Sequence, residues 1–348
     1  MAVWFQGQPV ATIAEGIARP GVAMTDDSLM PWFSGTKLVT AAAVMQLWDR
    51  GMLDLAAPVA SVIPEFGAHG KDAITLTHVL THTGGFRYLR GSGEMFVGGI
   101  APLELLERIY DAPLEDGWEP GRRAGYHPVT GFHVLGEVVR RVDGRAFDDY
   151  VSEEIFEPLG MADSWLALSA DRVRSYGDRV VVMHDTTHAP PQPVARFSTE
   201  TGFGWVEPSS SGIGPVRDLV RLAEALRRGG ELDGARILSE TAVAELRARR
   251  RVGMRDETFG SVMDWGLGVM VNSWRYERAP AFYGYGDSAG EDAFGHGGRQ
   301  SSVVFADPEH QVSVCFAANG MPGEPANHRR TQPVISALYE DLEIGPLA

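Results

Sequence analysis

The chain has 348 residues, of which 44% are hydrophobic and 22% charged, and its formal net charge is -15. This balance is typical of a globular protein and disfavours nucleic acid and anionic membranes as partners, because both select basic surfaces. The length exceeds that of one compact core and predicts two lobes or one large α/β unit.

The first residues predict a β-hairpin, with strands at 2–6 and 9–14 joined by a Gly7-Gln8 turn. No basic leader with a long apolar core stands at this end, and no run of about 18 apolar residues occurs along the chain. We therefore predict a cytoplasmic protein without a membrane span.

A helical pattern follows Ser34, with apolar residues at three- and four-residue steps and a Gly51 stop. The alanines at 41–43 indicate a central helix that packs closely on several sides. The later predicted elements are helices at 75–82, 102–110, 130–142 and 146–156, long loops with short strands over 170–215, helices at 217–228 and 239–250, a strand hairpin at 301–306 and 311–318, and a last helix at 333–342.

Strands at both ends with helices between them indicate one sheet built from both termini and a helical insertion. We expect an α/β (α+β) fold with a sheet domain formed by 1–55 and 206–348. The mainly helical domain would span 56–205, and the active site would lie at the interface.

Ser34 is the first candidate for chemistry, because one of only two lysines in the chain, Lys37, follows it by three residues. A serine at a helix N-terminus has a free backbone N–H that can stabilise an oxyanion. Lys37 would share its face of the helix. A buried lysine can lower the pKa of Ser34 or of a nearby phenol, or accept the proton itself when neutral.

Ordered landmarks over most of the chain resemble the serine β-lactamase and penicillin-binding-protein superfamily, on the branch with class C β-lactamases, D-stereospecific peptidases and family VIII carboxylesterases. The landmarks are Ser34-Gly35-Thr36-Lys37, Leu53-Asp54-Leu55 with Pro58, Ile63-Pro64-Glu65-Phe66, Ile74-Thr75-Leu76 before Leu80-Thr81-His82-Thr83-Gly84-Gly85, Pro120-Gly121, Tyr126, Leu135-Gly136, Pro158-Leu159-Gly160-Met161, Gly230-Glu231-Leu232-Asp233-Gly234 and Gly295-His296-Gly297-Gly298. The resemblance implies an antiparallel sheet flanked by helices, with the helical domain inserted.

The resemblance also implies roles for single residues. Ser34 would attack a carbonyl carbon, and Tyr126 would act as general base, as a phenolate stabilised by Lys37. His296 would occupy the third motif, on an edge strand that faces the nucleophile. The backbone N–H of Arg299 would be the second oxyanion donor beside that of Ser34. No metal or other cofactor is implied.

Two departures from the β-lactamase pattern favour ester substrates. The second motif reads Tyr126-His127-Pro128, without the asparagine that orients an amide, and His296 replaces a lysine. The resemblance places His127, Gly297 and Gly298 among the substrate-binding candidates. Two aromatic residues next to the nucleophile, Trp32 and Phe33, join them. In a third departure, the chain begins at the first strand, whereas family members usually have a helix before it.

Several other patterns suggest different chemistry. Gly286-Asp287-Ser288-Ala289-Gly290 matches the nucleophile elbow of α/β-hydrolases, but lacks a helical pattern after it. His78 and His82 have the spacing of a zinc helix without its glutamate, so we expect a structural role, and a metal role for His184 and His188 is disfavoured. The residues Arg247, Arg249, Arg250, Arg251 and Arg255 predict a solvated helix face, and Cys315 a buried strand residue.

These patterns together predict a serine acyl hydrolase that forms a covalent acyl-enzyme, and favour a carboxylesterase acting on small esters. A transacylase that passes the acyl group to an alcohol or amine is the main alternative. A D-amino-acid peptidase, a β-lactamase and a non-catalytic binding module are less favoured. The acyl group and the oligomeric state stay open, and we expect the loops at 86–100, 170–205 and 275–292 to form the pocket.

Overall fold

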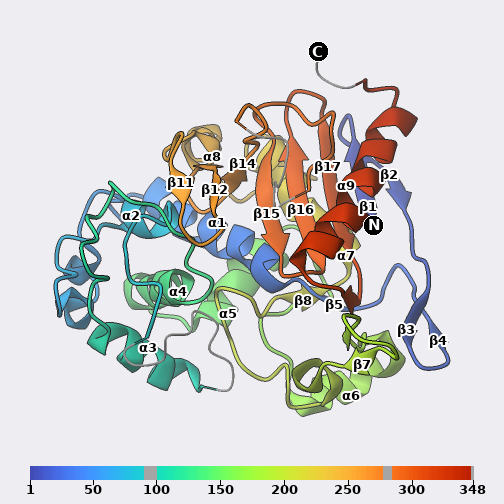
Figure 1. The fold of residues 1–348 in the computed structure, drawn as a ribbon, viewed down its shortest axis with the longest axis horizontal. Helices are drawn as coiled ribbons and strands as arrows, with labels where there is room; N and C mark the ends of the chain where they lie inside the picture. Colours follow the sequence, from blue (N-terminus) through green and yellow to red (C-terminus); the bar gives the residue numbers. More distant parts are fainter. Residues whose placement is uncertain (90–99, 277–283, 346–348) are drawn as a thin grey trace.

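The computed structural model describes residues 1–89, 100–276 and 284–345. Its centre is a seven-stranded antiparallel sheet in the order β13-β14-β15-β16-β17-β1-β2 (Figure 1). The strands are β1 (Ala2–Phe5), β2 (Gln8–Thr12), β13 (Asp264–Trp265), β14 (Met270–Val271), β15 (Phe294–Gly298), β16 (Ser302–Asp307) and β17 (Val312–Ala317). The predicted antiparallel sheet built from both termini is therefore confirmed, as are both predicted hairpins.

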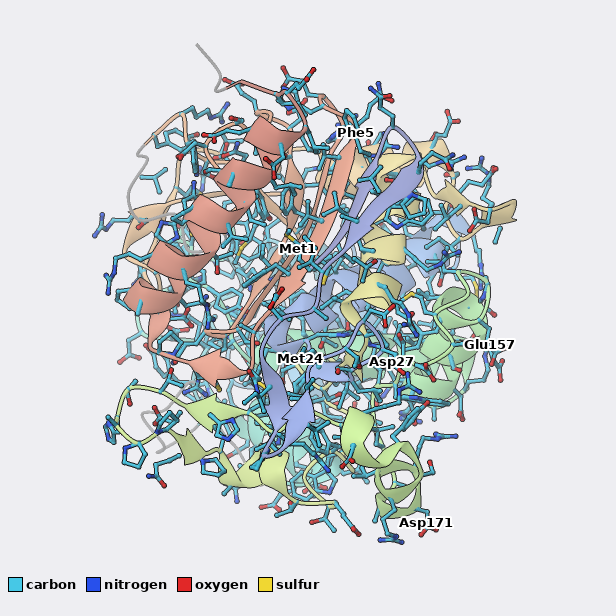
Figure 2. All side chains as sticks on the ribbon, turned by 90° about the vertical axis from the view of Figure 1, so that its right-hand side faces the viewer. Met1, Phe5, Met24, Asp27, Glu157 and Asp171 are labelled. Atoms are coloured by element: carbon cyan, nitrogen blue, oxygen red, sulfur yellow. The ribbon has the colours of Figure 1, made fainter. Side chains whose placement is uncertain are left out.

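Alternating side chains bury both faces of this sheet. Val303 and Phe305 belong to the same core cluster as Ile335 of α9 (Glu324–Asp341). Val304 belongs to the other cluster, with Leu219 of α7 (Val216–Arg227). Figure 2 views the sheet from the edge near β1 and shows α9 along one side of it. The helices on the two faces hold the strands that carry the third motif.

Most other helices lie to one side of the sheet in Figure 1. They are α2 (Leu76–Leu80), α3 (Pro102–Asp111), α4 (Thr130–Asp143) and α5 (Phe147–Val151), which continues into a π-helical turn, η4 (Ser152–Phe156). Helix α1 (Thr36–Asp49) runs between them and the sheet, and every residue from Thr36 to Leu47 is buried. The predicted central buried helix is thus confirmed.

Two predicted element boundaries are wrong. The last helix begins at Glu324 and not at Pro333, because Pro333 lies on its exposed side, where water can replace the missing backbone hydrogen bond. The stretch predicted as loops also contains α6 (Ala170–Tyr176). This helix begins at Ser169, whose Oγ accepts a hydrogen bond from the backbone N–H of Arg172 at 3.2 Å.

The prediction of a solvated arginine face is wrong in part, since Arg250 and Arg255 are exposed but Arg251 is buried. Helix α8 (Glu240–Arg247) ends at Arg247, so helical spacing does not apply to the arginines that follow. The Arg251 side chain is fully buried and lies 3.0 Å from the Asp256 carboxylate. Arg249 lies 3.0 Å from the buried carboxylate of Asp264. Arg251 is therefore a paired core residue, and Arg249 is a half-buried one.

Cys315 is buried in β17, as predicted. Over the described residues, no helix combines the length and the apolar character needed to cross a membrane.

Candidate active site

Ser34 lies in a short 3₁₀ turn, η1 (Phe33–Gly35), that leads directly into α1. Phe33, just before it, has a φ of 50°, which is a strained conformation for a bulky residue. The Ser34 N–H belongs to the first turn, where backbone amides have no acceptor within the helix. The turn therefore presents both the hydroxyl and an amide of the same residue.

The end of β15 packs directly on this turn. A Cβ atom on Gly298 would lie only 2.4 Å from the carbonyl oxygen of Trp32, so a larger residue would push the strand away. Ser302 Oγ donates to the same carbonyl oxygen at 2.8 Å. The backbone of the third motif thus packs against the turn that carries Ser34.

The turn after β15 is held by the start of α9. The Gly323 N–H donates to Gln300 Oε1 at 2.7 Å, and the Gln300 N–H faces Glu324 Oε2 at 3.4 Å. Arg299 precedes Gln300 and lines the same pocket as Ser34. This position is compatible with the predicted oxyanion amide of Arg299, whose role remains a prediction.

Lys37 is fully buried, with its Nζ atom 3.1 Å from Ser34 Oγ. The amine also donates to the carbonyl oxygens of Pro128 at 2.8 Å and Ser209 at 2.9 Å. Burial lowers the pKa of Lys37 well below its usual value, against the opposing charge of Glu207. As an ammonium, Lys37 donates to Ser34 Oγ and to both carbonyl oxygens. As a neutral amine it would keep two N–H bonds for the carbonyls and a lone pair for the Ser34 hydroxyl.

Tyr126 lies on the other side of the nucleophile, and its hydroxyl donates to Ser34 Oγ at 2.9 Å. Burial raises the pKa of this phenol far above its usual value. Lys37 Nζ lies over the Tyr126 ring, 5.1 Å from its centroid. The predicted phenolate base needs a lowered pKa, and burial shifts the pKa of Tyr126 in the opposite direction. The roles of Tyr126 and Lys37 in proton transfer stay predictions at this point.

A loop from the sheet side fixes Tyr126. Its N–H donates to Asp256 Oδ1 at 3.1 Å, and Thr258 Oγ1 donates to its carbonyl oxygen at 2.9 Å. The Phe259 ring stacks on the phenol at 4.8 Å between centroids. Because both backbone groups and the ring are held, the hydroxyl has little freedom to leave the nucleophile.

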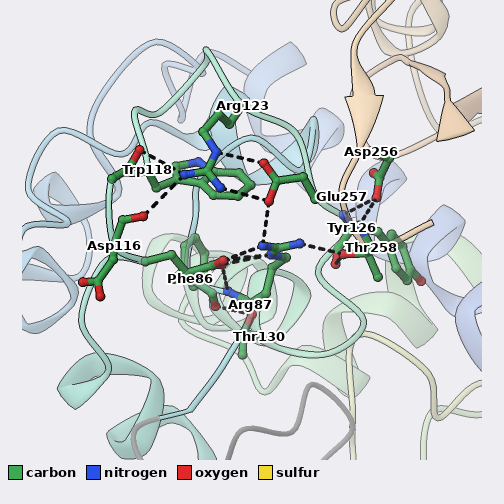
Figure 3. Close-up of polar contacts among 12 residues, drawn as sticks. Phe86, Arg87, Asp116, Trp118, Arg123, Tyr126, Thr130, Asp256, Glu257 and Thr258 are labelled. Atoms are coloured by element: carbon green, nitrogen blue, oxygen red, sulfur yellow. Dashed lines mark hydrogen bonds and ion pairs between the residues drawn. The ribbon is translucent and has the colours of Figure 1, made fainter. Parts of the chain in front are cut away.

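Behind this loop lies a network of charged side chains (Figure 3). Arg87 donates to Thr258 Oγ1 at 3.1 Å and to Glu115 Oε2 at 2.6 Å. Glu257 bridges Arg87, at 3.2 Å, to Arg123, at 2.8 Å. None of these residues is predictable from sequence, because they come from three separate segments and no single segment carries a motif.

The histidines near the site are buried, and burial lowers their pKa values. Burial and the nearby Lys37 lower the pKa of His296 to about 3, and His296 Nδ1 lies 2.7 Å from the Gly297 carbonyl oxygen, to which it donates. Burial lowers the pKa of His127 to about 3 as well. The His127 N–H donates to His82 Nδ1 at 3.1 Å. None of these rings supplies a fixed positive charge.

Three sequence predictions need correction here. Strand β15 is not an edge strand, because β14 pairs with it at Phe294 and Gly295, although that pairing ends before His296. Trp32 is fully buried, and its indole N–H donates to the Gly214 carbonyl oxygen at 3.1 Å. His127 is likewise fully buried, so both side chains belong to the core and not to the pocket surface.

A cavity of about 420 Å³ opens at the nucleophile. Ser34 lines it, and so does Phe33, as predicted. Gly297 and Gly298, which were also predicted to bind substrate, lie in β15 and are not part of the cavity lining. Much of the remaining lining comes from 185–205, which confirms the expectation for the loop at 170–205. The loops expected at 86–100 and 275–292 fall partly outside the described residues. The segment 205–211 adds further wall residues.

The rival motifs find no support. The described residues 284–293 around Ser288 contain neither a strand nor a helix, and an elbow requires both. His78 caps α2, with its Nδ1 accepting from the Thr75 N–H at 3.2 Å, as expected for a structural role. Where the structure describes the chain, no group of three or more His, Cys, Asp or Glu residues could hold a metal ion, so His184 and His188 belong to no such group.

Comparison with known proteins identifies the family of this chain. The family described as Beta-lactamase matches residues 1–338. This chain belongs to that family. It is 28% identical over 347 residues to the esterase/beta-lactamase LipL of Mycobacterium tuberculosis, which covers 92% of this chain and 76% of LipL. Among solved structures, a penicillin-binding protein homologue from Caulobacter crescentus has a TM-score of 0.77 and 32% identity, over 97% of this chain and 91% of that chain.

A family VIII carboxylesterase structure is also similar, with a TM-score of 0.76 and 27% identity over 96% of this chain and 91% of that chain. The predicted superfamily and the fold class are therefore confirmed. The protein is an enzyme, a serine hydrolase of the β-lactamase fold, which sets aside the non-catalytic binding module.

Proposed function

We propose that the protein is a carboxylesterase that hydrolyses small esters through an acyl-enzyme on Ser34. The observation that carries this proposal is the contact of Ser34 Oγ with Lys37 Nζ at 3.1 Å and with the Tyr126 hydroxyl at 2.9 Å. A serine held between a neutral amine and a phenol has a proton acceptor on one side and a proton donor on the other.

In the first half-reaction, Ser34 Oγ attacks the ester carbonyl carbon while its proton moves to Lys37 Nζ. The carbonyl oxygen becomes an oxyanion, which the N–H groups of Ser34 and Arg299 would stabilise. When the intermediate collapses, the bond to the alcohol oxygen breaks. Tyr126 donates its proton to that oxygen, and the Lys37 ammonium returns a proton to Tyr126, so the free alcohol leaves and both groups are restored.

In the second half-reaction, water takes the place of the alcohol. The same steps run in the reverse order and release the carboxylic acid, with Ser34 regaining its proton. A transacylase would differ only in the acceptor, since an alcohol or amine can occupy the position of water.

The second and third motifs support esters over β-lactams. Pro128 contributes its carbonyl oxygen to Lys37 and has no side-chain amide to orient an amide substrate. His296 is buried with a pKa lowered to about 3, so it does not provide the positive charge that would bind a substrate carboxylate.

Intact-mass measurement after incubation with p-nitrophenyl acetate and p-nitrophenyl butyrate tests the proposal. The native enzyme should gain an acyl group that water removes, whereas Ser34→Ala should gain none and lose at least about 10³-fold in turnover. Ser288→Ala is the matched control and should retain both the transient acyl adduct and the native turnover.

An adduct that persists in water and discharges to an added alcohol or amine would favour the transacylase. Unchanged turnover in Ser34→Ala would contradict the proposal.

A further inference from the structure

We propose that the cavity beside Ser34 selects uncharged esters whose acyl group carries an aromatic or similarly flat apolar ring. This inference rests on the proposed function, because it assigns the acyl side of the substrate to a specific wall of the same site. Three aromatic rings and one indole, from two segments that are far apart in the sequence, form that wall.

The rings form a continuous series that begins next to the nucleophile. Phe33, adjacent to Ser34 in the chain, packs edge-on against Phe197, with 5.1 Å between ring centroids and 79° between planes. Phe197 in turn lies 5.9 Å from Phe203. All three line the cavity together with Ser34. Since aromatic rings prefer edge-to-face and offset contacts, a substrate ring can extend this series.

The wall is held in place before any substrate binds. The Phe197 N–H donates to the Val194 carbonyl oxygen at 2.9 Å. A Cβ on Gly202 would lie 1.6 Å from the Arg196 carbonyl oxygen, so only glycine allows the segment to close on itself. Arg196 pairs with Glu207 at 2.8 Å, which ties the segment to the protein beneath it. A preformed wall loses little conformational freedom on binding.

The remaining lining fits an uncharged, apolar group. Val194, Ile213 and Met321 add aliphatic surface, and Trp205 lies at the rim with 39% of its surface exposed. The charged residues of the lining balance one another, with two cations and two anions: Asp185, Arg196, Glu207 and Arg299. The cavity of about 420 Å³ is within the ordinary range for a small-molecule site.

The test compares kcat/KM for p-nitrophenyl phenylacetate and p-nitrophenyl acetate, which share one leaving group. We expect the native enzyme to prefer the phenylacetate by about tenfold or more. Phe197→Leu keeps apolar volume but removes the ring, and Trp205→Ala removes an exposed rim side chain that the core does not need. Each should reduce the phenylacetate-to-acetate ratio by about threefold to tenfold.

Leu103→Ala, at a residue that is 74% exposed on α3, is the control and should leave the ratio unchanged. Thermal unfolding of each variant checks that it folds. Acetate turnover with no preference for phenylacetate, or a preference that survives both substitutions, would overturn the aromatic assignment while the esterase proposal stands. No turnover and no adduct on Ser34 with either ester would overturn both.

Discussion

Lys37 shows how one buried side chain can be prepared for proton transfer by its immediate surroundings. Two backbone carbonyls, those of Pro128 and Ser209, accept hydrogen bonds from Nζ. Burial lowers the pKa of Lys37, and the charge of Glu207 opposes that shift. Arg196 faces Glu207 at 2.8 Å and so weakens its influence. The protonation of Lys37, the proposed base, therefore depends on an ion pair that lines the cavity beside Ser34.

This arrangement predicts opposite pH shifts for two substitutions. Lys37 accepts a proton only when neutral, so activity should rise with pH through its pKa. Arg196→Gln leaves the charge of Glu207 uncompensated, which stabilises the ammonium and should move the rise in kcat/KM to higher pH by about one unit. Glu207→Gln removes the negative charge that stabilises the Lys37 ammonium, so the rise in kcat/KM should move to lower pH. The pH profile of p-nitrophenyl acetate hydrolysis measures both shifts.

Arg196→Lys, which keeps the positive charge, is the control and should restore the native profile. Burial lowers the pKa values of the nearby histidines His82, His127, His133 and His296, so the rise in activity is assigned to Lys37 and not to them. Shifts of the same sign in both variants would contradict the assignment of the rise to Lys37.

Single residues were predictable where the chemistry is local. Ser34 and Lys37 are three residues apart on one helix turn, so sequence alone brings them together. The burial of Trp32 depends on contact with Gly214, about 180 positions later in the chain, and no local pattern shows it. The pKa of Tyr126 likewise depends on how completely the fold buries its ring.

Among the elements, the hairpin β11 (Arg255–Asp256) and β12 (Ser261–Val262) places a loop on the second motif. Its turn contributes Thr258, which donates to the Tyr126 carbonyl oxygen at 2.9 Å and accepts from Arg87 at 3.1 Å. Asp256, at the end of β11, pairs with the buried Arg251. The hairpin thus links Tyr126, the proposed proton donor, to the buried side chains of Arg87 and Arg251.

This link predicts that Thr258 is a positioning residue. Thr258→Val keeps the shape of the side chain but removes both hydrogen bonds, so the Tyr126 hydroxyl should spend less time on Ser34. We expect kcat to fall about tenfold with little change in KM, because substrate contacts are not altered. Steady-state kinetics with p-nitrophenyl acetate separates the two constants.

Thr258→Ser retains the hydroxyl and should recover most of the native kcat. A rise in KM with kcat unchanged in Thr258→Val would show that the loop acts on binding and not on Tyr126.

Elements with strong local signals were predicted well. The two hairpins have alternating apolar residues and turn residues, and α1 has an apolar period and a glycine stop. The start of α9 was missed because a proline usually stands at the beginning of a helix, which favoured a start at Pro333. Only the tertiary fold shows that Pro333 lies on the exposed side of α9, where the helix tolerates a proline. Helix α6 was missed because prolines, serines and glycines surround it.

For the whole molecule, the sequence predicted a sheet built from both termini because apolar strands stand at both ends. The proposed division into 1–55 with 206–348 and 56–205 follows the same logic. The structure also shows a continuous hydrophobic core, which the order of the predicted elements could not reveal. One hydrophobic cluster joins α1 to Phe132 of α4, to Leu219 of α7 and to Val304 of β16. The core therefore continues across the proposed boundary.

A continuous core predicts that the two proposed domains unfold together. Every residue of α1 from Thr36 to Leu47 is buried, so neither side can separate without exposing apolar surface. We expect one calorimetric transition with equal calorimetric and van't Hoff enthalpies. Ala42→Leu, at a fully buried position of α1, should overpack both sides and destabilise this single transition by about 1–3 kcal/mol. Leu103→Ala serves as the exposed control, and two resolved transitions would show that the boundary at 56–205 separates independent folding units.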